Sequence, residues 1–419
     1  MAITDINAYA HLSDADVAEL GAKLDDMRRR VESDRGERDA RYLRRTIAGQ
    51  RIVEAAGRLV LWNNKSRTEW LVGTALLSAA KIIENMELGH NVMHGQWDWM
   101  NDPEVHSTSW EWDMVCASPH WKHSHNYIHH KYTNVYGMDE DLGYEVMRVT
   151  RDEPWEPKHL GGPFINIFLA ATFEWGIALH DLHLSDVVSG KRPWVEAKPQ
   201  LTQFAAKVGR QLAKDYVLFP ALSGRRARRT ASANLTANLV RNLWAYVVIF
   251  CGHFPDGAEK FTVESLENET QGQWYLRQML GTANFRAGRV MAFMSGNLCY
   301  QIEHHLFPDL PSNRYAEMGV EIRELCDTYD LPYTTGSLAR QYWQSLRTIW
   351  KLSVPDRFLS ATSDDAPETA SERRFGARTG VARRVAELGS GEVGTTVRRG
   401  LKTAIDEARR PRRMAAATQ

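Results

Sequence analysis

The chain has little that would support a disulfide framework, a thiolate metal site or a nucleic-acid interface. Its 419 residues include only four cysteines, Cys116, Cys251, Cys299 and Cys326, and no two of them form a CxxC pair. Thiols spread in this way argue against a disulfide-rich scaffold and a thiolate zinc site. Basic and acidic residues each number 52, so the formal net charge is zero, whereas a dedicated nucleic-acid binder carries a basic surplus. We therefore expect no nucleic-acid partner.

The chain also lacks an uninterrupted apolar run of the roughly 18 residues that mark a membrane span, and its mean hydropathy is −0.44. We expect no secretory signal, because the first residues are acidic and no basic start precedes an apolar stretch. Three segments nevertheless mix apolar residues with charges at helical spacing, as helices around a polar membrane site do: residues 70–88, 164–184 and 235–254. A fourth stretch, residues 216–222, is short and is followed by the basic run at 225–229. Hydropathy alone leaves a soluble helical protein and a membrane protein equally acceptable.

The pattern divides the chain into three parts. Residues 1–67 are predicted to form a cytoplasmic amphipathic region that opens with Ser13 as a helix cap, and the basic residues from Arg41 to Arg67 predict a cytoplasmic face. Residues 68–360 form the main domain. Residues 361–419 are predicted to be a disordered basic tail, since 12 basic and five acidic residues follow from Glu372 onward with few large apolar ones. The string GSGEVG in this tail matches a dinucleotide fingerprint by chance, because the strand and helix it requires are not predicted.

The histidines are the informative residues, because they gather in three short strings. The strings are GHNVMHGQW with His90 and His94, HSHNYIHHKYTN with His125, His129 and His130, and YQIEHHLFPDLP with His304 and His305. Residues three or four apart lie on one helix face, with Cβ atoms about 5–6 Å apart, and suit one metal ion. Adjacent residues diverge by roughly 100° and suit two different ions. The two tandem pairs therefore indicate a dinuclear centre.

The ligand type narrows the choice of metal. Imidazole suits zinc, copper, iron and nickel, but the HExxH string of zinc peptidases is absent. So many imidazoles exceed one tetrahedral zinc and fit two ions of higher coordination number, for which iron with an open position for O2 is the natural interpretation. The alternative, histidines grouped by chance, explains neither the tandem pairs nor their spacing.

These strings resemble the histidine boxes of the integral-membrane fatty-acid desaturases, HxxxH, HxxHH or HxxxHH, and QxxHH. The strings ENMELGHNVMHGQWDWMNDP, CGHFPDG and GNLCYQIEHHLFPDLPSNR are especially similar to the actinobacterial acyl-CoA delta-9 (stearoyl-CoA) desaturases, over about residues 65–355. The resemblance implies an all-α, polytopic membrane helical bundle of about four spans, capped by a cytoplasmic helical domain that carries the boxes. It also implies that His253 is an eighth iron ligand and that Gln301 is a possible one, directly or through water.

The resemblance implies a chemistry and a set of partners. Two non-haem irons would use O2 and two electrons to place a cis double bond in a long-chain acyl-CoA or acyl-lipid, with stearoyl-CoA or palmitoyl-CoA at the delta-9 position as the expected substrate. Electrons would come from a separate NAD(P)H-dependent reductase or ferredoxin-type donor. The site would face the cytoplasm from a multi-pass protein of the cell membrane, in contact with membrane lipids. A di-iron lipid hydroxylase, or a non-catalytic metal-binding membrane protein, remain alternatives.

The other histidines are expected to lie outside the metal site. His106, His120 and His123 are predicted in loops or behind the ligands, His180 and His183 at the membrane interface, and His11 and His159 at the surface. The tryptophan-rich segment from Trp97 to Trp121 is a candidate lining of the acyl tunnel, with a core or interfacial role as the alternative.

Overall fold

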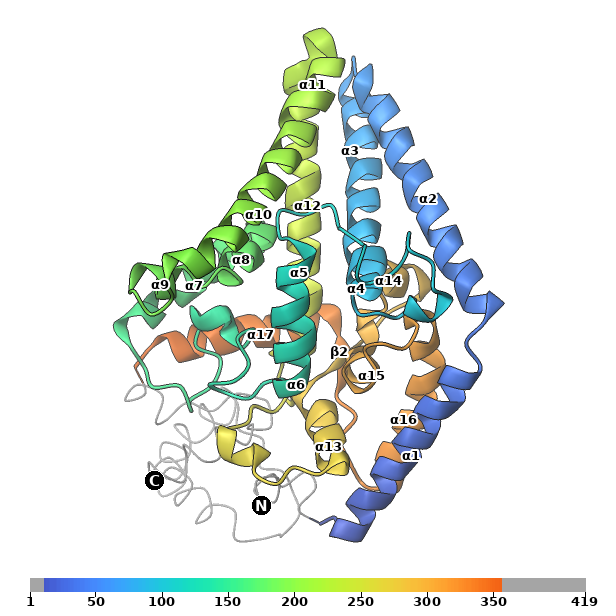
Figure 1. Cartoon of the computed structure of the whole chain (residues 1–419), viewed down its shortest axis with the longest axis vertical. Coiled ribbons are helices and arrows are strands. Elements are labelled where there is room, and N and C mark those ends of the chain that lie inside the picture. Colours follow the sequence, from blue (N-terminus) through green and yellow to red (C-terminus); the bar gives the residue numbers. More distant parts are fainter. Residues whose placement is uncertain (1–10, 356–419) are drawn as a thin grey trace, which may run out of the picture.

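Helices make up nearly all regular structure in residues 11–355, the part of the chain that the computed structural model describes. Four long helices form the upright bundle of Figure 1: α2 (Glu37–Trp62), α3 (Arg67–Ile82), α10 (Trp194–Leu212) and α12 (Ala227–His253). Four more lie around its base: α1 (Asp14–Ser33), α13 (Gln271–Gly281), α16 (Tyr315–Thr328) and α17 (Leu338–Ser353). The described strands, β1 (Asn284–Arg286) and β2 (Thr335–Ser337), pair in parallel. The predicted all-α class is confirmed, with this small sheet added.

Short elements connect these helices. The short α-helices are α4 (Asn91–Met93), α5 (Ser118–Trp121), α6 (His130–Tyr132), α7 (Gly162–Ala171), α8 (Phe173–His180), α9 (Leu184–Val188), α11 (Phe219–Leu222), α14 (Arg289–Met294) and α15 (Gln301–Leu306). Three π-helices continue α-helices: η2 (Ile83–His90) follows α3, η4 (Lys122–His129) lies between α5 and α6, and η7 (Ala213–Leu218) follows α10. The 3₁₀ turns are η3 (Asp98–Met100), η5 (Gly143–Glu145), η6 (Pro157–Gly161), η8 (Gly224–Arg226), η9 (Val263–Leu266), η10 (Leu298–Tyr300) and η11 (Ser312–Arg314).

The helices α2 and α3 form a tight hairpin. Ser66 caps α3 by accepting from the backbone N–H of Glu69, whose carboxylate accepts in return from the backbone N–H of Ser66. The two helices pack so closely that a Cβ at Gly73 would lie 2.7 Å from Cγ of Leu61. Because α2 packs along α3, the domain boundary placed at residue 67 falls inside a helical hairpin.

The basic stretch from Arg41 to Arg67 does not lie at one end of the molecule. It begins near the base of α2 and ends at the first residue of α3, and a helix of 26 residues is roughly 39 Å long. These charges therefore run along the length of the hairpin, and their placement on a cytoplasmic face stays a prediction.

The third and fourth long helices meet at the basic run. The elements α10, η7 and α11 follow one another from residue 194 to 222, and Gly224 then turns the chain with a φ of +56° into α12. The short apolar stretch 216–222 is thus the end of a long helix. The basic run 225–229 lies at the turn and the start of α12 rather than inside a span.

Within residues 11–355, one helix is both long and apolar enough to cross a membrane, Gly224–His253. The helical segments Pro157–Ala171 and Phe173–His180 meet the same test together, but they are bent by 107° relative to each other. The segment 164–184 is therefore not a single straight helix, because the chain leaves helical geometry at Thr172.

The base of the molecule is tied to α1 and to the start of α2. The guanidinium of Arg314 is buried and pairs with Asp39 of α2, with Nε and Oδ1 2.7 Å apart, and with Asp34 at 2.8 Å. Apolar side chains of α1, α13 and α16 share one core there, including Leu24, Leu276 and Ile322. The predicted tail 361–419, with its GSGEVG string, lies outside the described residues.

Candidate metal centre

Each histidine box lies where a helix ends or widens. His90 closes η2 and His94 follows α4, whereas His125 and His129 lie in η4. His130 opens the next short helix. A π-helix inserts an extra residue into a helical turn and is frequent at functional sites. The sequence predicts the spacing of these side chains but not this widened backbone.

The third box and the eighth histidine complete the set. His304 and His305 lie in α15, which ends at Leu306, shortly before Pro308. His253 is the last residue of α12. The eight histidines predicted as ligands therefore come from helix ends that meet at the base of the bundle (Figure 1).

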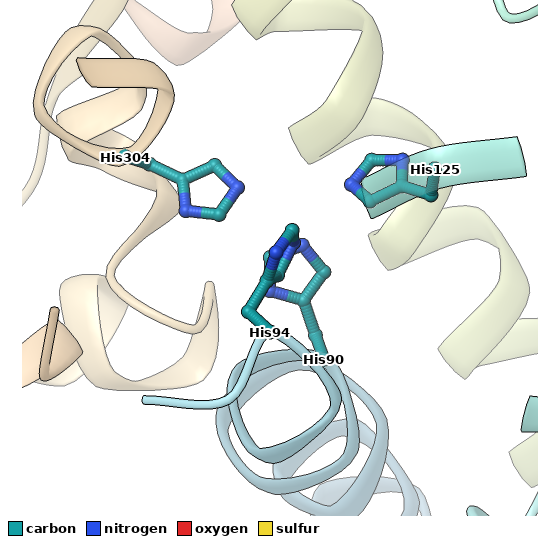
Figure 2. A group of neighbouring side chains, drawn as sticks. All are labelled: His90, His94, His125 and His304. Carbon is teal, nitrogen blue, oxygen red and sulfur yellow. The ribbon is translucent and has the colours of Figure 1, made fainter. Parts of the chain in front are cut away.

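The first group of imidazoles consists of His90, His94, His125 and His304, whose ligand atoms all lie within 4.8 Å of one another. Figure 2 shows the four rings turned toward a common point from three separate segments. The ring centroids of His90 and His94 are 4.6 Å apart, and those of His94 and His304 are 4.7 Å apart. This arrangement can hold one metal ion.

The second group lies beside the first. Ligand atoms of His129, His253 and His305 lie within 4.8 Å of one another, and His130 makes such a set with His304 and His305. His304 thus joins the first group and His305 joins the second, and both also lie in the set that contains His130. All eight predicted histidines take part in these groups, and two metal ions can be held side by side.

The ring nitrogens in these groups fit metal ligation. Among the residues that the structure describes, the buried Nε2 atoms of His94, His125, His129, His304 and His305 have no hydrogen-bond partner. A buried polar atom without a partner is costly, and so many at one place are best explained by a bound cation. Neutral imidazole is a ligand for iron, zinc and copper alike.

The opposite ring nitrogens are held by the protein. Nδ1 of His129 lies 2.9 Å from Asp139, and Nδ1 of His125 lies 3.2 Å from Asp141. Nδ1 of His304 lies 3.2 Å from the hydroxyl of Tyr315. Such partners fix the ring orientation and its tautomer, and they raise the basicity of the ligand nitrogen.

Sequence reasoning missed these partners. Asp139 and Asp141 belong to the string MDEDLG, which follows the second box and which the sequence indicates only as an acidic loop. Three carboxylates about ten residues after a histidine box were the feature of the sequence that could have indicated these partners. Tyr315 and Asn91, whose Oδ1 lies 3.0 Å from Nδ1 of His90, carried no such signal.

Burial sets the protonation of the site. It lowers the pKa of His94, His130, His304 and His305 well below the ordinary value, so these rings are neutral near pH 7. His129 differs: burial opposes its protonation, but the Asp139 and Asp141 carboxylates together outweigh burial and raise its pKa. The carboxylates beside the site thus counter the cost of bringing a cation into it.

Gln301 contacts the eighth histidine. Its side-chain Nε2 lies 3.0 Å from Nε2 of His253. A Cβ on Gly252 would lie 2.7 Å from Cγ of Gln301, so only glycine allows this close approach. The arrangement places Gln301 against a predicted ligand.

The remaining histidines stay apart from the two groups. The ring centroids of His180 and His183 are 6.2 Å apart, and His183 faces Glu140 instead, at 3.6 Å. His159 is buried rather than at the surface. Its Nδ1 accepts a hydrogen bond from the backbone N–H of Glu156, and its Nε2 lies 3.1 Å from a carboxylate oxygen of Glu153. The prediction of a surface position for His159 is wrong.

A narrow cavity of about 40 Å³ lies against the histidine groups. His90, His125, His129 and His253 reach it, and most of its other lining is apolar: Met86, Trp112, Met114, Trp121, Phe173 and Ile249. Trp112 and Trp121 come from the tryptophan-rich segment, as the tunnel interpretation expects. A mostly apolar cavity beside the histidine groups suits an apolar part of a ligand.

Buried charges hold one wall of this cavity, residues 110–117, here called the wall segment. Between α4 and α5 the chain rises into the bundle next to α12 (Figure 1). The carboxylate of Asp113 pairs with Lys81 of α3 at 3.0 Å and with Lys214 of η7. The guanidinium of Arg241 in α12 donates to the backbone carbonyl of Asp113 at 3.0 Å. Three of the long helical units therefore clamp this segment from inside the bundle.

The fold and the site together define a helical protein suited to metal chemistry on an apolar chain. The family model described as "Fatty acid desaturase" matches residues 68–337, and the chain belongs to this family. The "NADPH-dependent stearoyl-CoA 9-desaturase" of Mycobacterium tuberculosis is 56% identical over 421 residues, which cover 99% of this chain and 96% of that protein. The family predicted from the histidine boxes is confirmed.

More distant relatives share the central region. The "sn-1 linoleoyl-lipid 6-desaturase" of Synechocystis sp. is 23% identical over 272 residues, 63% of this chain and 74% of that protein. The "Acyl-lipid (8-3)-desaturase" of Physcomitrium patens is 26% identical over 244 residues, 56% of this chain and 50% of that protein.

Proposed function

We propose that this protein is an O2-dependent desaturase that places a cis double bond at the delta-9 position of stearoyl-CoA or palmitoyl-CoA. The observation that carries the proposal is the two buried histidine groups at a narrow apolar cavity. The 56% identity to a stearoyl-CoA 9-desaturase supports this substrate and position. Each turnover removes one hydrogen from each of two adjacent methylenes. With O2, two electrons and two protons, it yields the double bond and two waters.

The proposed metal ligands divide into two sets for two non-haem irons. His90, His94, His125 and His304 form the first set, and His129, His253 and His305 form the second. His130 converges with His304 of the first set and with His305 of the second. Their convergence and their unpartnered nitrogens support this division. When bound, iron would supply the O2 chemistry that breaks an unactivated C–H bond. Gln301 is proposed to orient His253, because its amide contacts that ring.

The remaining residues of the site position the reactants. Asp139 and Asp141 hold His129 and His125 in one orientation. Trp112 and Phe173 line the cavity and exclude water from the acyl chain, which confines the reaction to the methylenes that lie beside the metals.

We further propose that α2, α3, the α10–α11 unit and α12 cross the membrane. Large apolar side chains on their outer surfaces support this: Leu59 is 64% exposed, Leu71 60%, Val217 64% and Leu243 50%. Several charged residues lie inside instead, as Lys81 and Asp215 do, 3.0 Å apart. Charges inside and apolar residues outside are typical of helices in lipid.

The proposed orientation places the histidine end in the cytoplasm. Electrons would come from a separate NAD(P)H-dependent reductase or a ferredoxin-type donor. Two observations support an external donor: the described residues contain only two short strands, β1 and β2, and the M. tuberculosis relative is named NADPH-dependent. The other proposed partners are O2, the acyl-CoA and membrane lipids.

Reconstitution tests the proposal. We expect full-length protein, extracted with detergent and supplied with NADPH and a reductase, to convert stearoyl-CoA to oleoyl-CoA, with about two irons bound per chain. Gas chromatography of the methyl esters would identify the product and its double-bond position, and elemental analysis would count the metal.

Two results would contradict the proposed desaturase activity and favour another function. A hydroxylated acyl chain as the main product would indicate a di-iron hydroxylase. Zinc or variable metal content without turnover would indicate a non-catalytic metal-binding protein. The assignment of membrane spans would fail separately, if fully active protein were recovered without detergent.

A further inference from the structure

A second cavity, of about 950 Å³, lies between α2 and α14, with the buried Ile83 of η2 among its lining residues. It is here called the arginine pocket, after four residues that line it: Arg38, Arg41, Arg45 and Arg289. No aspartate or glutamate is among the described residues that line it. A cavity lined by one sign of charge concentrates ions of the opposite sign, so its chemistry favours an anion.

Two of these arginines are available to a ligand. Arg38 pairs with Glu317, and Nη2 of Arg41 lies 3.5 Å from a carboxylate oxygen of Glu37. Arg45 and Arg289 are exposed, and within residues 11–355 neither has an acidic partner. They belong to different elements, α2 and α14, and both line the same cavity. An anion between them would therefore join the two elements.

The pocket lies where the apolar outer surface of α2 begins. Arg45, Ile52 and Leu59 follow one another at intervals of seven, which places them on nearly the same helix face. Ile52 is 68% and Leu59 64% exposed. On the other side of the pocket, Val290 of α14 is 78% exposed beside Arg289. Arginine followed by exposed apolar residues marks the level of lipid headgroups, given the membrane spans proposed above.

The arginine pocket is separate from the acyl cavity. Among the described residues, none lines both. Ile83 and Phe293, which line the arginine pocket, pack in an apolar cluster with Leu88 and Val92 of the segment that carries His90. An acyl chain in the arginine pocket would therefore not approach the histidine groups through these residues.

From these observations we infer that the arginine pocket binds an anionic phospholipid. The phosphate lies between Arg45 and Arg289, and the acyl tails follow the exposed face of α2 past Ile52 and Leu59. Guanidinium groups bind phosphate through charge-assisted hydrogen bonds. The lipid would connect α2 with α14 and so support the segment beneath them that leads to His90.

The test measures lipid binding and needs no turnover. Iron-loaded full-length protein in detergent is titrated with phosphatidylglycerol or phosphatidylcholine, and bound lipid is counted by native mass spectrometry. The double variant Arg45→Gln/Arg289→Gln should bind phosphatidylglycerol roughly 30-fold more weakly. The control Arg44→Gln/Arg286→Gln removes the same charge from exposed arginines outside the pocket, and it should bind as the wild type does.

Several outcomes would overturn the inference: equal affinity for the two lipids, equal loss in the control, or displacement of the lipid by inorganic phosphate or by stearoyl-CoA at matched concentrations. Displacement by inorganic phosphate would assign the pocket to free phosphate, and displacement by stearoyl-CoA would assign it to the substrate. Iron content and desaturation are measured on the same samples. Failure of lipid binding with intact turnover would reject this inference alone, whereas lipid binding without turnover would reject only the proposed function.

Discussion

At the scale of single residues, the tandem histidines of the second box give a direct test of the site. His129 and His130 belong to different sets of converging imidazoles, so either substitution removes a different part of the proposed centre. We expect His129→Ala and His130→Ala each to abolish desaturation, measured by product chromatography. His183→Ala is the control, because its ring lies outside these sets, and it should retain substantial activity. Equal damage from the control would refute the ligand assignment.

The carboxylate behind His129 should affect metal affinity more than reaction outcome. Asp139 is buried and lies 2.9 Å from Nδ1 of His129. Asp139→Asn keeps the shape but removes the charge, and we expect iron affinity to fall about 10–100-fold. Competition with a chelator would measure this loss. Excess iron should restore the wild-type product, and failure of this rescue would mean that Asp139 serves the structure rather than the metal.

Residue spacing predicted the histidines but not their supports. Ligands three or four residues apart, such as His90 and His94, depend only on local helix geometry, so one string of sequence is enough to find them. Asp139 also lies near its box in sequence, but an acidic loop has many uses. Tyr315 reaches His304 from a separate helix, and no local pattern encodes such a contact.

At the scale of elements, the wall segment depends on its ion pairs. Asp113 pairs with Lys81 and Lys214, and Lys81 is almost fully buried. Asp113→Asn removes one of the two carboxylates beside the buried Lys81, which keeps its pair with Asp215 at 3.0 Å, so it should lower the free energy of unfolding by roughly 1–3 kcal/mol. Thermal inactivation in detergent would measure the effect. Glu104→Gln changes an exposed carboxylate in the same loop and should have no effect; an equal loss would contradict this account.

The same buried charges explain which helices the sequence missed. Lys207, Lys214 and Asp215 face inward from the long helix at residues 194–222. These charges lower the mean hydropathy of the segment, although large apolar residues lie on its outer surface. For the segment 164–184, the prediction of a single helix was wrong for the opposite reason. It is apolar enough for one span, but it bends after Ala171, and Glu174 turns inward to pair with Arg241.

At the scale of the whole molecule, the buried imidazoles make stability depend on pH. Burial depresses the pKa of His94, His130, His304 and His305 below the ordinary 6.5. The contribution of these neutral rings to the free energy of unfolding is therefore complete above about pH 6.5. It is lost as the pH falls below that value, because the unfolded chain binds protons that the folded site does not bind. His129, with its raised pKa, partly offsets this trend.

We expect the unfolding temperature of metal-free protein in detergent to be nearly constant between about pH 7 and 8 and to decline below about pH 6.5. Differential scanning fluorimetry across this range would record the decline. An unfolding temperature that rises on acidification would contradict the neutral, buried state of these rings.

The four helix ends that supply the imidazoles have a consequence for the biogenesis of the protein. His94 and His304 are far apart in the chain and belong to one set, so a metal ion bound to both would close a long loop of the chain. Metal-binding energy of this kind becomes folding energy. We therefore expect the iron supply at the time of synthesis to determine how many copies mature and how many are removed by proteases, so that iron scarcity would reduce the abundance of the protein as well as its activity.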